Sequence, residues 1–231
     1  MNWWTRILDF ISPRQCVVCG ERLAPTERSI CTVCMFHLPR TKFQWKPADN
    51  IMAQSFWYLT PVERAAALFF FTPHSEVAQI VYDLKYANRP DVGEDMGRLI
   101  VNEMRPAGFF DGIDALLPVP LARNRLRQRG YNQSERLATG ISQLTGLPVV
   151  RDAVDRHPFT ESQTHLNHLE RRQNVENIFS VHDDGPLRHR HVLIVDDVCT
   201  TGATITALCD AIRHVDGIRM SVLTLGYTKV Q

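Results

Sequence analysis

Hydrophobic and polar positions divide most of the chain into short apolar runs that alternate with segments of helical periodicity. Apolar runs bounded by prolines or charged residues predict buried strands, and they occupy residues 65–71, 114–120, 191–197 and 219–227. Apolar residues spaced three and four apart predict helices at residues 75–87, 91–104, 132–146 and 203–215. Strands that alternate with helices predict an α/β fold with a mostly parallel sheet flanked by helices. Ligands of such sheets bind beyond the carboxyl ends of the strands.

The first fifty residues follow a different pattern. Helical spacing near the N-terminus involves Trp3, Trp4, Ile7, Leu8 and Ile11. We predict a short helix that packs on its own domain; the alternative is a docking face for a membrane surface or a partner helix, for which Asp9 and a single arginine make a poor polar face. Residues 40–50 are polar, contain a proline and predict a linker. We therefore divide the chain into a small N-terminal unit, residues 1–48, and a main domain, residues 49–231.

Composition and charge exclude several classes of protein. A length of 231 residues suits one full domain with a small appendage. The formal net charge of +1 gives no indication of a bulk electrostatic attraction to nucleic acid. No apolar run approaches the roughly 20 residues that a membrane span needs, and the N-terminus lacks the features of a signal peptide. We expect a cytoplasmic protein without a membrane span.

Four of the six cysteines form two matched pairs separated by eleven residues. The pairs are Cys16 with Cys19 and Cys31 with Cys34. Two residues between thiols allow both sulfurs of a tight turn to face one ion, and two such turns supply the four thiolates that zinc prefers. The alternative, two disulfides or redox pairs, is disfavoured without a secretion signal. Four thiolates leave no open coordination position, so we predict a structural zinc ion that stabilises the N-terminal unit.

Two adjacent acids, Asp196 and Asp197, end the apolar run at residues 191–197. The small and hydroxyl-bearing residues that follow are Cys199, Thr200, Thr201, Gly202, Ala203 and Thr204. Unsatisfied N–H groups at the start of the next predicted helix, together with threonine hydroxyls, suit a phosphate monoester. Carboxylates would repel that phosphate, so we expect them to accept hydrogen bonds from a pair of neighbouring hydroxyls, as on a ribose. A 5-phosphorylated ribose satisfies both halves of the motif.

Other interpretations of this motif have less support. An apolar strand that ends in two acids also occurs in magnesium sites of nucleotide triphosphatases, but these require a Gly-Lys pair, which the chain lacks. The glycine fingerprint of dinucleotide-binding folds is also absent. A strand, turn and helix with a purely structural role remains the alternative.

The stretch VLIVDDVCTTGAT resembles the motif with which type I phosphoribosyltransferases bind phosphoribosyl pyrophosphate (PRPP). Further stretches appear in the order seen in the ComF family of competence-associated proteins. They are CVVC with CTVC, LKYANRP, PVPLARNRLRQRGYNQSERLA and TESQTHLNHLERRQNVENIF. The resemblance covers nearly the whole chain and implies a type I phosphoribosyltransferase-like domain.

The resemblance implies a role for each part of the PRPP motif. Asp196 and Asp197 would hold the 2- and 3-hydroxyls of the ribose at the catalytic centre, and residues 199–204 would hold the 5-phosphate. The connection after the strand at 114–120 takes the place of the pyrophosphate loop, and its arginines are Arg123, Arg125, Arg127 and Arg129. Arginine suits pyrophosphate because it donates a bidentate fork. We choose Arg129 as the ligand, whereas a solvated surface is the alternative for this run.

The stretch TESQTHLNHLERRQN corresponds to a mobile loop that closes over PRPP in related folds. Its residues that fit the family pattern are Thr160, Gln163, Arg171 and Asn174. His165 and His168 lie in the same loop and are candidates for an acid or a base, although no visible environment favours either of them.

The implied reaction is glycosyl transfer at C1 of PRPP, with magnesium at the departing pyrophosphate. No pattern in the chain identifies the acceptor. Two hypotheses remain. The first is an active phosphoribosyltransferase. The second is a PRPP-sensing or scaffold protein without turnover, which acts through the zinc segment on competence (DNA-uptake) or other DNA-processing partners.

Overall fold

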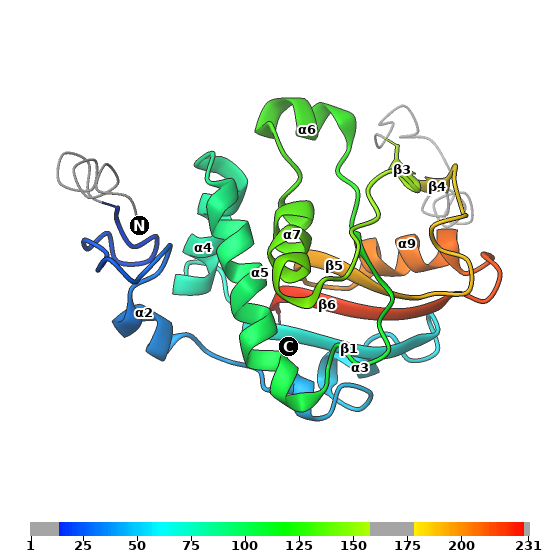
Figure 1. The fold of residues 1–231 in the computed structure, drawn as a ribbon, viewed down its shortest axis with the longest axis horizontal. Helices are drawn as coiled ribbons and strands as arrows, with labels where there is room; N and C mark the ends of the chain where they lie inside the picture. Colours follow the sequence, from blue (N-terminus) through cyan, green and yellow to red (C-terminus); the bar gives the residue numbers. More distant parts are fainter. Residues whose placement is uncertain (1–13, 158–177, 229–231) are drawn as a thin grey trace, which may run out of the picture.

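The computed structural model describes residues 14–157 and 178–228, and its centre is a four-stranded sheet (Figure 1). The strands are β1 (Val62–Phe70), β2 (Ala115–Pro118), β5 (His191–Cys199) and β6 (Arg219–Tyr227). Their order is β1-β6-β5-β2, and every pair is parallel. Strands β5 and β6 are buried almost throughout, which explains why they have continuous apolar runs. The predicted α/β class with a mostly parallel sheet is confirmed.

Four longer helices accompany the sheet, as the periodicity predicts. They are α4 (Glu76–Tyr86), α5 (Pro90–Met104), α7 (Gln133–Thr145) and α9 (Ala203–Ile212). The hydroxyl of Ser75 caps α4 by accepting the N–H of Ala78 at 3.2 Å. The side chain of Asn132 caps α7 in the same way, through the N–H of Ser134 at 3.0 Å, and Gly146 ends this helix in the left-handed region.

Helices α5 and α7 lie side by side, and α7 packs on β5 and β2 (Figure 1). Two glycines allow the helix backbones to touch. A Cβ atom on Gly97 would lie 2.2 Å from the carbonyl oxygen of Leu137, and one on Gly140 would lie 2.1 Å from the carbonyl oxygen of Glu94. Both distances are impossible for a real side chain, so the position of α7 over the sheet depends on these two residues.

Shorter elements complete the described fold. They are α2 (Thr32–His37), η1 (Phe43–Trp45), α3 (Ile51–Gln54), η2 (Arg105–Ala107), α6 (Arg123–Arg129) and an antiparallel pair, β3 (Val154–Arg156) with β4 (Phe179–Val181). Helix α6 forms within the connection that we expected to be a loop. Its arginines, leucine and glutamine favour helix, and Gly130 ends it with φ 82°. No helix of the described ranges has the length and apolar character required to cross a bilayer.

The prediction of a linker at residues 40–50 is wrong. The N–H of Thr41 donates to the carbonyl of Leu68 at 3.0 Å, and the N–H of Phe70 donates to the carbonyl of Pro39 at 2.8 Å. Phe43 is buried, and its ring meets that of Phe70 edge to face at 5.6 Å. The physical reason is that β1 ends the sheet, and its outer edge needs partners for its backbone groups.

The cysteine segment is attached to α5 by polar contacts. The hydroxyl of Ser29 donates to Asp95, and Arg28 lies 3.5 Å from the same carboxylate. Arg40 forms an ion pair with Glu103 at 2.8 Å. The predicted helix over Trp3 to Ile11 lies outside the described residues.

The glycine contact between α5 and α7 generates a stability prediction. Gly140→Ala should lower the free energy of unfolding by about 3 kcal/mol, because the added methyl group meets the backbone of α5 and this outweighs the gain in helix propensity. Urea denaturation followed by circular dichroism measures the change. Gly185→Ala is the matched control, since its methyl group would approach only the Asp183 carboxylate, at 3.2 Å. Equal stability of the two variants would contradict the proposed backbone contact.

Candidate functional site

The two predicted acids lie side by side near the carboxyl end of β5 and are almost completely buried. Asp196 is 8% exposed and Asp197 is 4% exposed. One oxygen of Asp196, Oδ1, accepts hydrogen bonds from the Ser134 hydroxyl at 2.8 Å and from the N–H of Asp197 at 2.9 Å. Because Ser134 lies in the first turn of α7, this bond joins the acid pair to that helix.

Asp197 has a cationic partner on a different helix. The ammonium nitrogen of Lys85, in the last turn of α4, lies 2.8 Å from its Oδ2 atom. The other oxygen, Oδ1, accepts the N–H of Val198 at 2.7 Å. The two neighbouring carboxylates therefore have different environments, one held by a neutral hydroxyl and the other by an ammonium group.

The environment of Asp196 makes its ionisation unusual. Burial, together with the adjacent charge of Asp197, raises the pKa of this carboxyl to about 7. The hydrogen bonds from Ser134 and the Asp197 N–H, and the charge of Lys85, act in the opposite direction. Asp196 therefore titrates near neutral pH.

The predicted phosphate loop connects β5 to α9. Strand β5 ends at Cys199 and α9 begins at Ala203, with Gly202 between them in the left-handed region at φ 77°. The ring of Phe56 lies below this glycine, and a Cβ atom there would be 3.1 Å from its Cε1 atom. Thr200 and Thr201 are exposed at the amino end of α9, where helix N–H groups have no partner within the helix. The amino end of α9 is therefore accessible at Thr200 and Thr201.

Two cysteines, one at the end of β5 and one on α9, are buried. Burial raises the pKa of the Cys199 thiol to about 12, and the charge of Asp196 contributes. Burial likewise raises the pKa of Cys209 to about 12. Both thiols are therefore protonated and pack as small apolar side chains.

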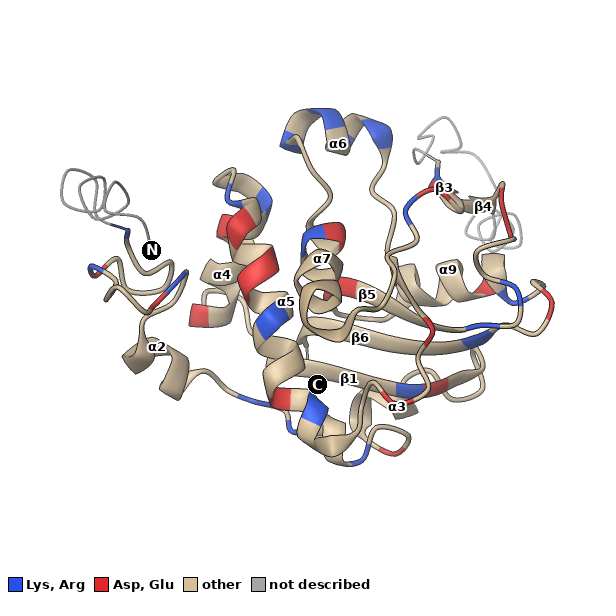
Figure 2. Cartoon of the chain, in the orientation of Figure 1, with Lys and Arg blue, Asp and Glu red and all other residues tan. Residues whose placement is uncertain are grey.

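The four predicted arginines lie on α6, which carries a concentration of positive charge (Figure 2). Arg129 is partly buried and donates to the side chain of Gln133. Its guanidinium carbon lies 5.6 Å from the ring centroid of Tyr86, a residue of α4. The other three, Arg123, Arg125 and Arg127, are exposed. Arg129 thus differs from them in having a defined position.

Sequence analysis did not identify the partners of the acids. Lys85 lies in LKYANRP and Ser134 in RGYNQSERLA, two stretches that carry the family resemblance, but no role was assigned to either residue. A buried acid pair requires hydrogen-bond donors, and both stretches contain polar residues among regularly spaced apolar ones. This indirect pattern is the one feature of the sequence that points to Lys85 and Ser134. The hydroxyl of Tyr131, which is buried, donates to the carbonyl of Leu84 at 2.5 Å and joins the end of α4 to the start of α7.

The pair β3 and β4 flanks the stretch predicted to close over PRPP. The residues singled out there lie outside the described part of the chain: Thr160, Gln163, His165, His168, Arg171 and Asn174. Arg156 of β3 stacks on the ring of Phe179, with 5.4 Å from guanidinium carbon to centroid. Burial lowers the pKa of Arg156, whereas the charge of Asp196 raises it, so this arginine is electrostatically coupled to the acid pair.

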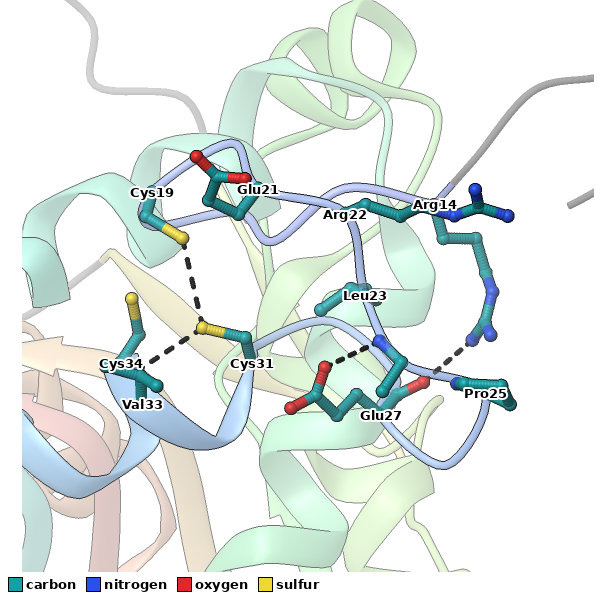
Figure 3. A pocket seen from close by; sticks show the side chains of 11 residues that line it. Arg14, Cys19, Glu21, Arg22, Leu23, Pro25, Glu27, Cys31, Val33 and Cys34 are labelled. Carbon is teal, nitrogen blue, oxygen red and sulfur yellow. Dashed lines mark hydrogen bonds between the residues drawn. The ribbon is translucent and has the colours of Figure 1, made fainter. Parts of the chain in front are cut away.

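The four predicted metal-binding cysteines come together in the N-terminal segment. The four sulfur atoms of Cys16, Cys19, Cys31 and Cys34 lie within 4.8 Å of one another, and all four are free thiols. The sulfurs of Cys19 and Cys31 are 3.8 Å apart, and a pocket opens beside them (Figure 3). The left-handed backbone of Gly20, at φ 75°, closes the first turn.

This donor set fits a tetrahedral zinc ion. Zinc–sulfur bonds of about 2.3 Å place sulfurs about 3.8 Å apart on the edges of a tetrahedron. Burial opposes ionisation of Cys16, but N–H groups of Cys31 and its own turn lower its pKa to about 7. Burial and the neighbouring thiols raise the pKa of Cys34. Crowded thiolates repel one another, and a divalent cation removes that repulsion.

The raised pKa of Asp196 generates a prediction about stability and pH. The folded-state pKa of about 7 exceeds the unfolded value of 3.8, so this carboxyl favours folding below pH 4 and loses that contribution as the pH rises through 7. Asp196→Asn removes the titration while its amide oxygen still accepts the Ser134 hydrogen bond. We expect this variant to be about 4 kcal/mol more stable than wild type at pH 8 and close to wild type at pH 4.

Thermal unfolding at both pH values tests this expectation. Asp152→Asn, at an exposed aspartate, controls for the loss of one negative charge. A wild-type protein that is as stable at pH 8 as Asp196→Asn would show that the buried carboxylate causes no strain.

Comparison with known proteins places the chain in a family. The profile of the phosphoribosyl transferase domain matches residues 109–227, more than half of the chain. The DNA utilization protein YhgH of Escherichia coli O157:H7 is 29% identical over 201 residues, which cover 84% of this chain and 81% of that protein.

Two further relatives share shorter regions. Competence protein F of Haemophilus influenzae is 31% identical over 140 residues, covering 59% of this chain and 61% of that protein. The bifunctional protein PyrR of Macrococcus caseolyticus is 31% identical over 101 residues, covering 43% and 54% respectively. The matched domain, these relatives and the four-cysteine cluster agree with one another, and the chain therefore belongs to the phosphoribosyl transferase domain family, as a member similar to competence protein F.

Proposed function

We propose that this chain binds PRPP at the carboxyl end of β5. The observation that carries the proposal is the buried pair Asp196 and Asp197, followed at once by the Gly202 turn into α9. A ribose with free 2- and 3-hydroxyls and a 5-phosphate has the hydrogen-bond donors for the acid pair and the negative charge for the Gly202 turn.

Each part of the site has a separate role in this proposal. Asp196 and Asp197 accept hydrogen bonds from the ribose hydroxyls. The 5-phosphate is held by the loop and the first turn of α9, through Cys199, Thr200, Thr201, Gly202, Ala203 and Thr204. Arg129 binds the pyrophosphate, because its position between Tyr86 and Gln133 already fixes the guanidinium group.

The proposed reaction transfers the 5-phosphoribosyl group to an acceptor and releases pyrophosphate. The bond from C1 to the pyrophosphate oxygen breaks, the acceptor forms a new bond to C1, and positive charge develops on the ring between the two events. The carboxylates at the adjacent hydroxyls stabilise that charge, while Arg129 stabilises the charge on the leaving group. Magnesium bound with PRPP would neutralise part of the pyrophosphate charge.

A second function is supported by the names of the relatives. YhgH is described as a DNA utilization protein and competence protein F by its role in competence. A chain that binds PRPP without turnover would serve as a sensor or scaffold in DNA uptake, with the cysteine segment contacting partners. The complete acid pair and threonine loop favour the enzyme, and pyrophosphate release separates the two functions.

We also propose that the four cysteines hold a structural zinc ion. The sulfur spacing and the closed set of four ligands support this assignment. The predicted division into an N-terminal zinc unit, residues 1–48, and a phosphoribosyltransferase-like domain, residues 49–231, is part of the same proposal, with the boundary moved to about residue 38 because Thr41 and Phe43 contact β1. So is a cytoplasmic location, since a reducing compartment maintains free thiols.

The first test is calorimetric titration of PRPP with magnesium into the zinc-loaded protein. We expect binding in the wild type, and a loss of at least about 100-fold in affinity when Asp196→Asn and Asp197→Asn are combined, because two charge-assisted hydrogen bonds are removed. Asp152→Asn combined with Asp183→Asn removes the same charge from exposed positions and should bind normally. Absence of wild-type binding at millimolar PRPP would overturn the proposed site.

Metal removal tests the zinc assignment. The purified protein should contain one zinc ion per chain, and Cys31→Ser should lose it, because three remaining thiolates bind more weakly. Chelation should expose the segment at residues 14–38 to proteolysis and leave the main domain folded, as the ion supplies the folding energy of the small unit. Full zinc occupancy in Cys31→Ser would contradict the four-thiolate site, and Cys209→Ser, at a buried cysteine outside the cluster, controls for loss of a thiol.

A further inference from the structure

The last turn of α4 contacts three separate parts of the proposed site. The Lys85 ammonium group pairs with Asp197 at 2.8 Å. The Tyr86 ring lies under the guanidinium of Arg129. The carbonyl of Leu84 accepts the hydroxyl of Tyr131, in the connection between α6 and α7. Three consecutive residues thus contact Asp197, Arg129 and the connection that follows Arg129.

The contact of Lys85 with Asp197 is a partly buried ion pair. The side chain of Lys85 is 25% exposed and that of Asp197 is 6% exposed. Burial of a carboxylate without a partner is unfavourable, and the ammonium group supplies that partner. The lysine pairs with Oδ2 while the backbone holds Oδ1, which fixes the orientation of the carboxylate.

Other charged groups face the acid pair and are weaker candidates for this task. Arg156, from β3, acts on Asp196 through its charge, but no ion pair between them exists in the described residues. The thiol of Cys199, on β5, is neutral. Ser134, on α7, supplies a neutral hydroxyl to Asp196. Among the residues that the structure describes, Lys85 is therefore the cation in direct contact with the pair.

We infer that the last turn of α4 positions the PRPP site, with Lys85 orienting Asp197 toward the ribose hydroxyls and Tyr86 orienting Arg129 toward the pyrophosphate. This inference rests on the proposed PRPP function. It adds residues that lie outside the PRPP motif and before the matched phosphoribosyl transferase domain, which begins at residue 109. Both residues act through a neighbour, so they are positioning residues.

The two halves of the inference predict different ligand dependence. Lys85→Met should weaken PRPP and ribose 5-phosphate by the same factor, about tenfold or more, because both ligands have the ribose hydroxyls. Tyr86→Ala should weaken PRPP more than ribose 5-phosphate, because only PRPP carries the pyrophosphate. Lys85→Arg should retain most of the affinity, since it keeps the cation. Lys46→Met, at an exposed lysine after η1, is the matched control.

A double-mutant cycle distinguishes positioning from a general structural effect. If Lys85 acts through Asp197, then Lys85→Met should change the PRPP affinity by less than twofold in an Asp197→Asn background. The pH dependence should also change. The charge of Lys85 lowers the pKa of the neighbouring Asp196, so in Lys85→Met PRPP binding should require a higher pH than in wild type. Circular dichroism and urea unfolding establish that each variant is folded.

The outcomes separate this inference from the proposed function. If PRPP binds to wild type, Lys85→Met and Tyr86→Ala with the same affinity, the inference is overturned but the proposed function is not. A Lys85→Met effect that persists unchanged beside Asp197→Asn, or that Lys85→Arg does not rescue, would also overturn it. Absence of PRPP binding in the wild type would overturn both proposals.

Discussion

Burial of two adjacent carboxylates at the end of a central strand is the constraint on which the rest of the site depends. Asp196 and Asp197 leave water almost completely, and each needs a partner to remain in the core. The partners come from segments far apart in sequence, Lys85 from α4 and Ser134 from α7. Folding therefore has to bring both helices to the carboxyl end of β5, where a ligand of a parallel sheet binds.

The packing of the helices follows from that requirement. Helix α7 can place Ser134 beside Asp196 because Gly97 and Gly140 let it lie directly against α5. The end of α4 is joined to the start of α7 by the buried Tyr131 hydrogen bond. One connected set of contacts thus links the helix layer, the acid pair and the arginine on α6. Because burial raises the pKa of Asp196, this arrangement lowers the stability of the fold as the pH rises through 7.

The cysteine segment uses a different source of stability. It adds a few buried apolar side chains, among them Leu23 and Ile30, to the core, and polar contacts join it to α5. Its four sulfur atoms lie within 4.8 Å of one another. A metal ion bound there would supply the stability that a hydrophobic core supplies in a larger domain. The stretch that follows the cysteine segment, residues 40–50, covers the outer edge of β1. This stretch protects the sheet from unwanted strand pairing.

The sequence by itself determined the elements whose signal is local. Continuous apolar runs identified β5 and β6, caps and periodicity identified α4 and α7, and cysteine spacing identified the cluster, because each depends on neighbours in the chain. Only the tertiary structure decided that Lys85 and Ser134 serve the acid pair and that residues 40–50 are not a linker. Those contacts join residues separated by up to 112 positions of chain, as for Lys85 and Asp197, and no local pattern encodes such a partner. The two acids in a buried strand indicate that hydrogen-bond donors must lie nearby. The packing of the helices on the sheet determines that Lys85 and Ser134 are those donors.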